Sequence, residues 1–152
     1  MMNTALVIGR EEVRFCTVDV TLFDLYEGAC EFVKAGAAAT FLKRQGEVEI
    51  IRSATLPIGV LQDIEIDTET RRLESGDYVI MVTEKSSHMI WIASMGNQKV
   101  ISKDGYLMNI QDTDILNPRE LAHHILGRVL EWSGEVPLDD MTVLVAGLWS
   151  KA

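Results

Sequence analysis

The sequence contains little cysteine and no long apolar run. Cys16 and Cys30 are its two cysteines. They are too few for a disulfide framework, so we interpret both as core residues of a protein in a reducing compartment. No apolar stretch approaches the roughly 18 residues of a membrane span, and residues 1–12 lack the basic start and cleavage pattern of a signal peptide. We therefore expect a cytoplasmic protein in which this segment makes no membrane contact.

Positive charge is also scarce. The 152 residues carry 14 Lys and Arg against 23 Asp and Glu, which gives a net charge of −9. Nucleic acids and anionic lipid surfaces attract clustered Lys and Arg, so we expect neither as a partner. The length suits one domain of about 100–200 residues, and the 47% hydrophobic content is that of an ordinary globular protein.

The first half of the chain has the alternating pattern of strands. Turn signals at Tyr26–Gly28, Gln45-Gly46 and Ser75–Asp77 separate the apolar runs, and residues 56–60 form a loop with Pro and Gly. Short connections of this kind join antiparallel strands, not βαβ units. We predict an antiparallel meander with strands in residues 13–25, 29–36, 37–44, 47–51, 64–74 and 78–83.

The second half contains the best helix pattern. Asn117 is the predicted cap, Pro118 occupies the first helical position and Glu120 completes a capping box. Residues 117–132 form the helix, with Leu121, Ile125 and Val129 in one apolar stripe. A closing apolar strand follows at 141–149. These elements predict an α+β fold with the helix packed on one face of a mostly antiparallel sheet. Residues 84–113 show no sustained period, so they form either a functional flap or a segment that fits its surroundings poorly.

Two adjacent aspartates precede the closing strand. Asp139 and Asp140 offer the oxygen ligands that Mg²⁺ and Mn²⁺ prefer. Neighbouring residues of a strand point to opposite faces, so one aspartate would bind a metal while the other orients Thr142 or the loop. The alternative is an Asp-rich turn without a ligand.

Five blocks of the sequence, in order, resemble the C-terminal phosphatase domain of stage II sporulation protein E, a metal-dependent serine/threonine phosphatase of the 2C type. The blocks are "GAAATFLKR" (36–44), "LPIGV" (56–60), "GDYVIMVT" (76–83), "NPRELAHHIL" (117–126) and "DDMTVLVAGLW" (139–149). The resemblance implies an αββα sandwich with a binuclear Mn²⁺ or Mg²⁺ centre. It also implies, as the substrate, a phosphorylated anti-anti-sigma factor whose dephosphorylation releases a sigma factor during sporulation. The full-length family protein is anchored to the membrane by an N-terminal region that this chain does not include.

The sequence departs from the family pattern in two places. Nothing matches the early Asp-Gly-x-Gly block, so we expect residues 1–152 to be a single, incomplete phosphatase-like domain. Where the family reads "VTDG", this chain has Glu84 and Lys85, which lengthens a ligand by one methylene and adds a positive charge. The resemblance therefore assigns Asp139 and Glu84 as metal ligands, Asp140 and Thr142 as supporting residues, and no catalytic side chain. We expect Mn or Mg binding to be weak or absent.

Other candidate residues favour structural roles. His123 and His124 lie about 100° apart on a helix and cannot chelate one ion together. His88 has no ligand spacing, and Asp104-Gly105 does not follow an apolar strand. Gly36 permits close packing of strands. Three functions stay open: a phosphatase, a non-catalytic binding module (a pseudophosphatase) and an unrelated interaction domain. Open sheet edges also predict a homodimer or aggregation.

Overall fold

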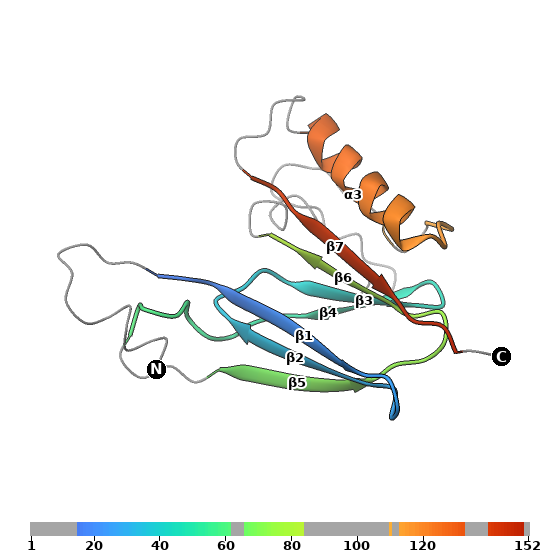
Figure 1. Ribbon diagram of the computed structural model, residues 1–152. Coiled ribbons are helices and arrows are strands. Elements are labelled where there is room, and N and C mark those ends of the chain that lie inside the picture. Colours follow the sequence, from blue (N-terminus) through green and yellow to red (C-terminus); the bar gives the residue numbers. More distant parts are fainter. Residues whose placement is uncertain (1–14, 62–65, 84–109, 111–112, 133–139, 151–152) are drawn as a thin grey trace. The chain divides into compact units, whose positions relative to one another are not determined.

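The computed structural model describes residues 15–61, 66–83, 110, 113–132 and 140–150 (Figure 1). The chain divides into two compact units: Met1–Ala38 with Arg52–Leu73, and Ala39–Ile51 with Glu74–Ala152. Several predicted positions lie outside the described residues, namely Glu84, Lys85, His88, Asp104-Gly105 and Asp139. No helix among the described residues has the length and apolar character that a membrane crossing requires.

The first unit contains a three-stranded antiparallel sheet in the order β1-β2-β5. Its strands are β1 (Val18–Asp24), β2 (Ala29–Ala35) and β5 (Asp67–Arg72). The turn between β1 and β2 is held by the Asp24 carboxylate, which accepts hydrogen bonds from the backbone N–H groups of Tyr26 and Glu27 at 2.9 and 3.0 Å. An aspartate at this position satisfies the turn's own backbone donors, so the predicted turn at 26–28 is confirmed.

Strand β2 carries a buried lysine on the same face as two apolar residues. Cys30, Phe32 and Lys34 alternate along its buried face and are 0%, 1% and 1% exposed. The Lys34 ammonium lies 2.7 Å from the carboxylate of Asp19, its register partner on β1. Burial lowers the pKa of Lys34, and the ion pair with Asp19 opposes that shift. A buried charge without such a partner would be costly, so this cross-strand pair is what the first sheet needs to keep its lysine charged.

The second unit contains a four-stranded antiparallel sheet in the order β4-β3-β6-β7. Its strands are β3 (Thr40–Arg44), β4 (Glu47–Ile51), β6 (Tyr78–Val82) and β7 (Val143–Gly147). The turn between β3 and β4 uses positive φ angles at Gln45 (45°) and Gly46 (83°), as the Gln-Gly pair predicted. Tyr78, Val79 and Ile80 are at most 4% exposed, so the strand after the Ser75–Asp77 turn is buried.

Helix α3 (Pro118–Trp132) packs against β7 in the second unit (Figure 1). The Asn117 side chain accepts hydrogen bonds from the backbone N–H groups of Arg119 and Glu120 at 2.9 and 3.2 Å, so the predicted cap is confirmed. The stripe of Leu121, Ile125 and Val129 is fully buried. The apolar period of the sequence therefore identified both the helix and its packed face.

The structure confirms the α+β class and corrects the predicted single meander. Residues 36–39 do not continue a strand; β3 begins at Thr40 and belongs to a different sheet from β2. Strand β3 pairs with β6, its partner across more than thirty residues, while β5 pairs with β2. Local alternation shows where strands lie, but it carries no information about which distant strands pair.

The interpretation of both cysteines as core residues is half right. Cys30 is fully buried, and burial raises the pKa of its thiol to about 11. Cys16 is exposed, forms an isolated antiparallel bridge with Ile58, and donates its thiol proton to the Thr17 carbonyl at 3.3 Å. Alternation in the run 13–25 predicted a strand that begins too early, since β1 starts at Val18.

Gly36 makes a close approach, but to a loop and not between strands as we expected. Its φ is +57°, and a Cβ atom there would lie 2.4 Å from the backbone nitrogen of Pro57. That distance is far inside van der Waals contact, and positive φ suits glycine alone without strain. Gly36 therefore allows the loop of residues 56–60 to lie against the end of β2.

Candidate functional site

The segments that lead to the predicted ligands meet at one end of the second sheet. The Thr83 backbone N–H donates to the Thr142 carbonyl at 3.1 Å, and the Thr142 N–H donates to the Thr83 side-chain oxygen at 3.0 Å. The first of these bonds continues the backbone ladder of β6 and β7, whose last register pair is Val82 with Val143, and the second adds a side-chain bond beside it. Consequently the end of β6, which precedes Glu84, lies beside the start of β7, which follows Asp140. We name these residues, Thr83, Asp140 and Thr142, the strand-end site.

Asp140 does not lie in the strand. Strand β7 begins at Val143, not at residue 141, and Asp140 is exposed. The prediction that alternation points two strand aspartates to opposite faces was wrong in its premise, because residues 140–142 are not in strand conformation.

Thr142 and Thr83 have a positional role in this geometry. Thr142 was predicted as a supporting residue, and its backbone amide and carbonyl both bind Thr83. Sequence analysis missed Thr83, although its hydroxyl follows a buried strand directly and such residues commonly bind nearby backbone groups. The pair fixes the separation of the two strand ends, which is a requirement for any ligand set that they share.

The described residues of the strand-end site are too few to hold a metal ion. Asp140 is the carboxylate that they contribute, and among the described residues no three His, Cys, Asp or Glu side chains come together as a metal-binding group. Divalent Mg²⁺ and Mn²⁺ need several oxygen ligands and compensating negative charge. A metal here would depend on Glu84 and Asp139, which lie outside the described residues.

A cleft of about 390 Å³ lies at the opposite end of the same sheet. It is lined by Lys43, Tyr78, the turns at 45–46 and 75–76, and residues 113–116. The Lys43 ammonium donates hydrogen bonds to the carbonyls of Ile110, at 2.9 Å, and Thr113. Lys43 therefore holds the segment before α3.

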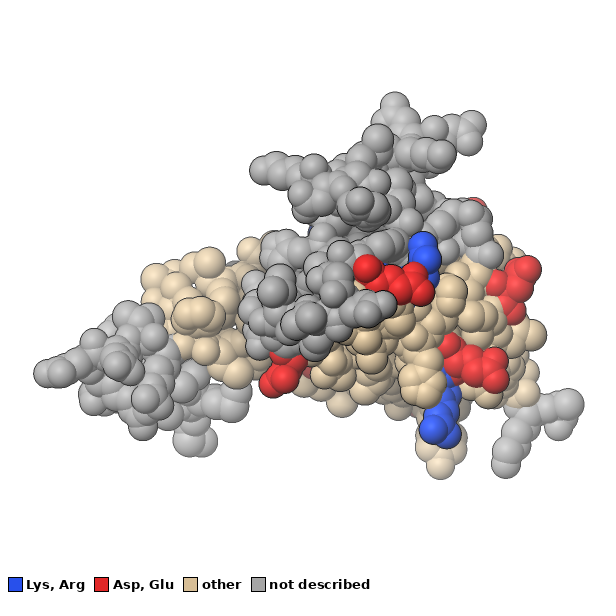
Figure 2. Space-filling model, turned by 90° about the horizontal axis from the view of Figure 1, so that it is seen from above, with Lys and Arg blue, Asp and Glu red and all other residues tan. Residues whose placement is uncertain are grey.

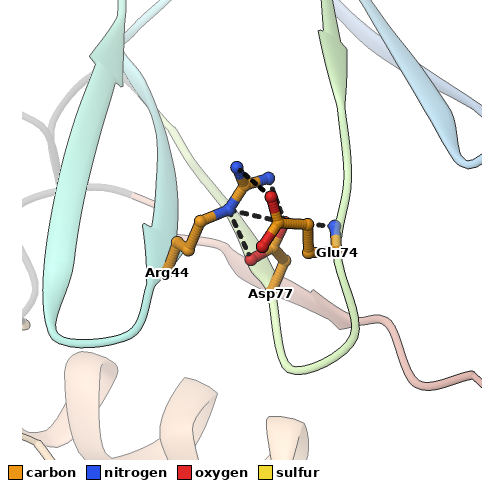
Figure 3. A network of polar contacts seen from close by, with 3 residues as sticks. All are labelled: Arg44, Glu74 and Asp77. Atoms are coloured by element: carbon orange, nitrogen blue, oxygen red, sulfur yellow. Dashed lines mark hydrogen bonds and ion pairs between the residues drawn. The ribbon is translucent and has the colours of Figure 1, made fainter.

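An arginine network closes the turn beside this cleft (Figure 3). Arg44 donates to the Asp77 carboxylate through Nε at 2.9 Å and Nη2 at 2.6 Å, and Asp77 also accepts the backbone N–H of Glu74 at 2.7 Å. Asp77 is 2% exposed, and the Arg44 side chain is 33% exposed. The hydrogen bond to Asp77 raises the pKa of the Arg44 guanidinium. This network joins the end of β3 to the start of β6 and has a structural role.

The remaining candidates take no part in the strand-end site. His123 and His124 are both exposed on α3, which agrees with the structural role predicted for them. On the face drawn in Figure 2, the Asp and Glu side chains of the described residues lie in separate places, some of them beside Lys or Arg. The described part of that face therefore offers no gathered carboxylates that could replace the strand-end site.

Comparison with known proteins identifies a family and a fold. The family model described as stage II sporulation protein E matches residues 1–148. The chain is 26% identical over 146 residues to stage II sporulation protein E of Bacillus subtilis (strain 168), covering 95% of the chain and 17% of that protein. It is also 26% identical over 148 residues to the same protein of Priestia megaterium, covering 97% of the chain and 24% of the relative.

Solved structures agree with this match. The Mn-presoaked phosphatase domain of the Bacillus subtilis protein superposes with a TM-score of 0.72 at 21% identity, covering 99% of the chain and 64% of that domain. A serine/threonine phosphatase of Mycobacterium tuberculosis superposes with a TM-score of 0.63 at 18% identity. The match covers 88% of this chain and 60% of the phosphatase. At these identities the likeness shows the fold, which is that of 2C-type phosphatase domains. The chain spans under two thirds of each of these structures.

Proposed function

Because the chain belongs to the stage II sporulation protein E family, we propose that it acts as a serine/threonine protein phosphatase-like domain on a phosphorylated anti-anti-sigma factor. The observation that carries this proposal is the meeting of β6 and β7 at the Thr83–Thr142 hydrogen bonds. That geometry brings together the two segments to which the family resemblance assigns metal ligands. It supports a phosphoserine site at this end of the second sheet.

The proposed ligands are Asp139 and Glu84, with Asp140 and Thr142 in support. A phosphoserine side chain carries about −1.5 to −2 charges at neutral pH, and the chain itself carries −9. Acidic residues alone would repel such a substrate, so Mn or Mg would supply positive charge for the phosphate and a nucleophilic water. The described residues do not by themselves fit a metal centre; they would hold the strand ends in place, and Glu84 and Asp139 would hold the metal.

A second candidate function is a binding module without catalysis. The observation that favours it is Lys85, which follows Glu84 where the family has a glycine after its aspartate. An ammonium group beside a cation site lowers cation affinity through like-charge repulsion. Such a chain would keep affinity for the phosphoprotein and lose turnover.

Phosphate release from the phosphorylated anti-anti-sigma factor in the presence of Mn²⁺ tests the first function. We expect turnover below about 1 s⁻¹, the low end of ordinary enzyme rates, and we expect Asp139→Ala to abolish it. The matched control is Glu131→Ala, an exposed carboxylate on α3, which should leave the rate unchanged. Turnover that persists in Asp139→Ala would contradict the proposed site.

Calorimetric binding of the phosphorylated and unphosphorylated factor separates the two functions. Preference for the phosphorylated form with no phosphate release would establish the binding module. Absence of both binding and release would overturn both candidate functions and leave the family fold without this activity.

A further inference from the structure

The β1–β2 hairpin carries large apolar side chains in contact with solvent. In the turn, Leu25 is 75% exposed and Tyr26 is fully exposed, and Leu22 on β1 is 52% exposed. A groove of about 670 Å³ lies beside them in the first unit. We name it the hairpin groove; it is lined by residues 22–26, Ala29, Glu31 and Thr70. Exposed apolar side chains that gather in one place, rather than singly, mark an interaction surface.

The hairpin groove lies over the outer face of the first sheet. The strand register places Leu22, Glu31 and Thr70 side by side across β1, β2 and β5. Side chains of register partners share a face, with their Cβ atoms about 5 Å apart. This face is opposite to the one on which Cys30 and Phe32 are buried. The groove therefore presents an apolar side chain, a carboxylate and a hydroxyl in one row.

Both charged residues that line the groove, Asp24 and Glu31, are acidic. An oxygen of the Asp24 carboxylate accepts two backbone N–H groups of the turn. Within the described part of the chain, no hydrogen bond or ion pair engages the Glu31 carboxylate, and Glu31 is half-buried. A carboxylate beside apolar surface attracts a cation more strongly than one in open water does. The groove therefore suits a partner that brings a positive charge next to an apolar group.

We propose that the hairpin groove binds an extended segment of a partner protein in which an apolar residue and a Lys or Arg stand two positions apart. Residues at this spacing point to the same side of an extended chain, about 6.6 Å apart, which is comparable with the spacing of Leu22 and Glu31. The apolar residue packs on Leu22 and Leu25, and the cation pairs with Glu31. A contact of this size is weak and transient. The groove belongs to the first unit and the strand-end site to the second, so this inference does not rest on the proposed phosphatase activity.

Fluorescence polarisation of labelled synthetic peptides tests this binding with the full chain. The probe peptide repeats Leu-Ser-Lys-Ser. One comparison peptide has Glu in place of each Lys, and another has Ser in place of each Leu. The probe should bind with a dissociation constant of about 100 μM, and each comparison peptide should bind at least about tenfold more weakly. Absence of probe binding at about 1 mM, or equal binding of the leucine-free peptide, would overturn the proposal.

A charge reversal at Glu31 tests the position of the cation. Glu31→Lys should weaken binding of the probe about tenfold and should strengthen binding of the glutamate peptide. Glu47→Lys is the matched control, because Glu47 is exposed on β4 of the second sheet and the variant has the same net charge. It should bind the probe as the wild type does. Equal losses in the two variants would show a general attraction to the chain's net charge of −9 and would overturn the site.

A polar substitution at Leu22 tests the apolar contact. Leu22→Ser should weaken binding of the probe about tenfold. Leu144→Ser is its control, since Leu144 is also 52% exposed, on β7, and it should bind as the wild type does. Both leucines are half exposed, so the variants should fold, which circular dichroism verifies. Unchanged binding by folded Leu22→Ser would overturn the proposed contact.

Discussion

Removing one partner of the Arg44–Asp77 pair should reveal how strongly the arginine network holds the second sheet. Arg44→Met keeps much of the aliphatic length of the side chain and deletes its charge. The carboxylate of Asp77 would then remain, 2% exposed, with the Glu74 backbone N–H as a remaining donor. Asp77→Ala leaves the Arg44 guanidinium without this carboxylate. That group is already 33% exposed, so water can solvate it.

The two single substitutions should lower the free energy of unfolding by different amounts. Breaking a buried ion pair by removing one partner typically costs about 3–5 kcal/mol. The stability loss of Arg44→Met should be about 3 kcal/mol, at the low end of this range, because the Glu74 backbone N–H still donates to Asp77. Partial exposure of Arg44 reduces the cost of Asp77→Ala to about 2 kcal/mol. Because both losses concern one interaction, the double variant should lose about 1–2 kcal/mol less than the sum of the single losses.

Urea unfolding of the four proteins at pH 7 measures these free energies. Because the pKa of Arg44 is raised by its hydrogen bond to Asp77, the guanidinium stays charged under these conditions. The control pair is Arg128–Glu131 on α3, which has the same chemistry at 2.8 Å with side chains 45% and 63% exposed. Arg128→Met should cost under about 0.5 kcal/mol. An Arg44→Met loss no greater than that of Arg128→Met would refute the reasoning.

Three further substitutions have expected outcomes in the same urea assay. Asn117→Ala should cost about 1 kcal/mol through loss of the helix cap, and Asn117→Ser should retain most of the stability. Gly36→Ala should cost about 2 kcal/mol or more, since its Cβ would overlap Pro57; a neutral result would contradict that close approach. Asp19→Asn should cost about 3 kcal/mol by leaving the Lys34 ammonium buried without its partner. Because burial lowers the pKa of Lys34, the folded variant binds fewer protons than the unfolded chain, so its stability should rise as pH increases toward about 10; a fall over that range would contradict it.

The sequence was sufficient for the elements whose signals are local. The cap at Asn117 and the stripe of Leu121, Ile125 and Val129 both followed from spacing alone, and the helix lies where they predicted. The Gln45-Gly46 turn was equally local. These features are decided by backbone chemistry within a few residues, so a single sequence contains the information.

Features that depend on distant partners were not predicted. The division into two sheets rests on pairing β3 with β6 and β2 with β5, and no local pattern specifies those partners. The buried charges were missed for a related reason. Lys34 lies on the buried face of β2 with Cys30 and Phe32, and its partner Asp19 is evident only from the register of β1. Asp77 resembled an ordinary turn residue until β3 brought Arg44 beside it.

The strand-end site was predictable only through family resemblance. Composition and spacing suggested a metal at Asp139 or Asp140 without deciding between a ligand and a turn. The resemblance added Glu84, and the structure added the Thr83–Thr142 hydrogen bonds that bring the two segments together. The role of Thr83 depends on a partner 59 residues away, which no pattern in the sequence identifies.

The central claim is that the ends of β6 and β7 form the family's metal site in this chain. Calorimetric titration of Mn²⁺ tests this claim most directly. Three proteins are compared: the wild type, Asp139→Ala and Asp140→Ala. We expect the wild type to bind weakly, with a dissociation constant of about 1 mM, because few carboxylates are available to balance the cation. Asp139→Ala should show no binding, and Asp140→Ala should bind nearly as the wild type does. Equal binding by the wild type and Asp139→Ala would contradict the assignment of this end of the sheet as the metal site.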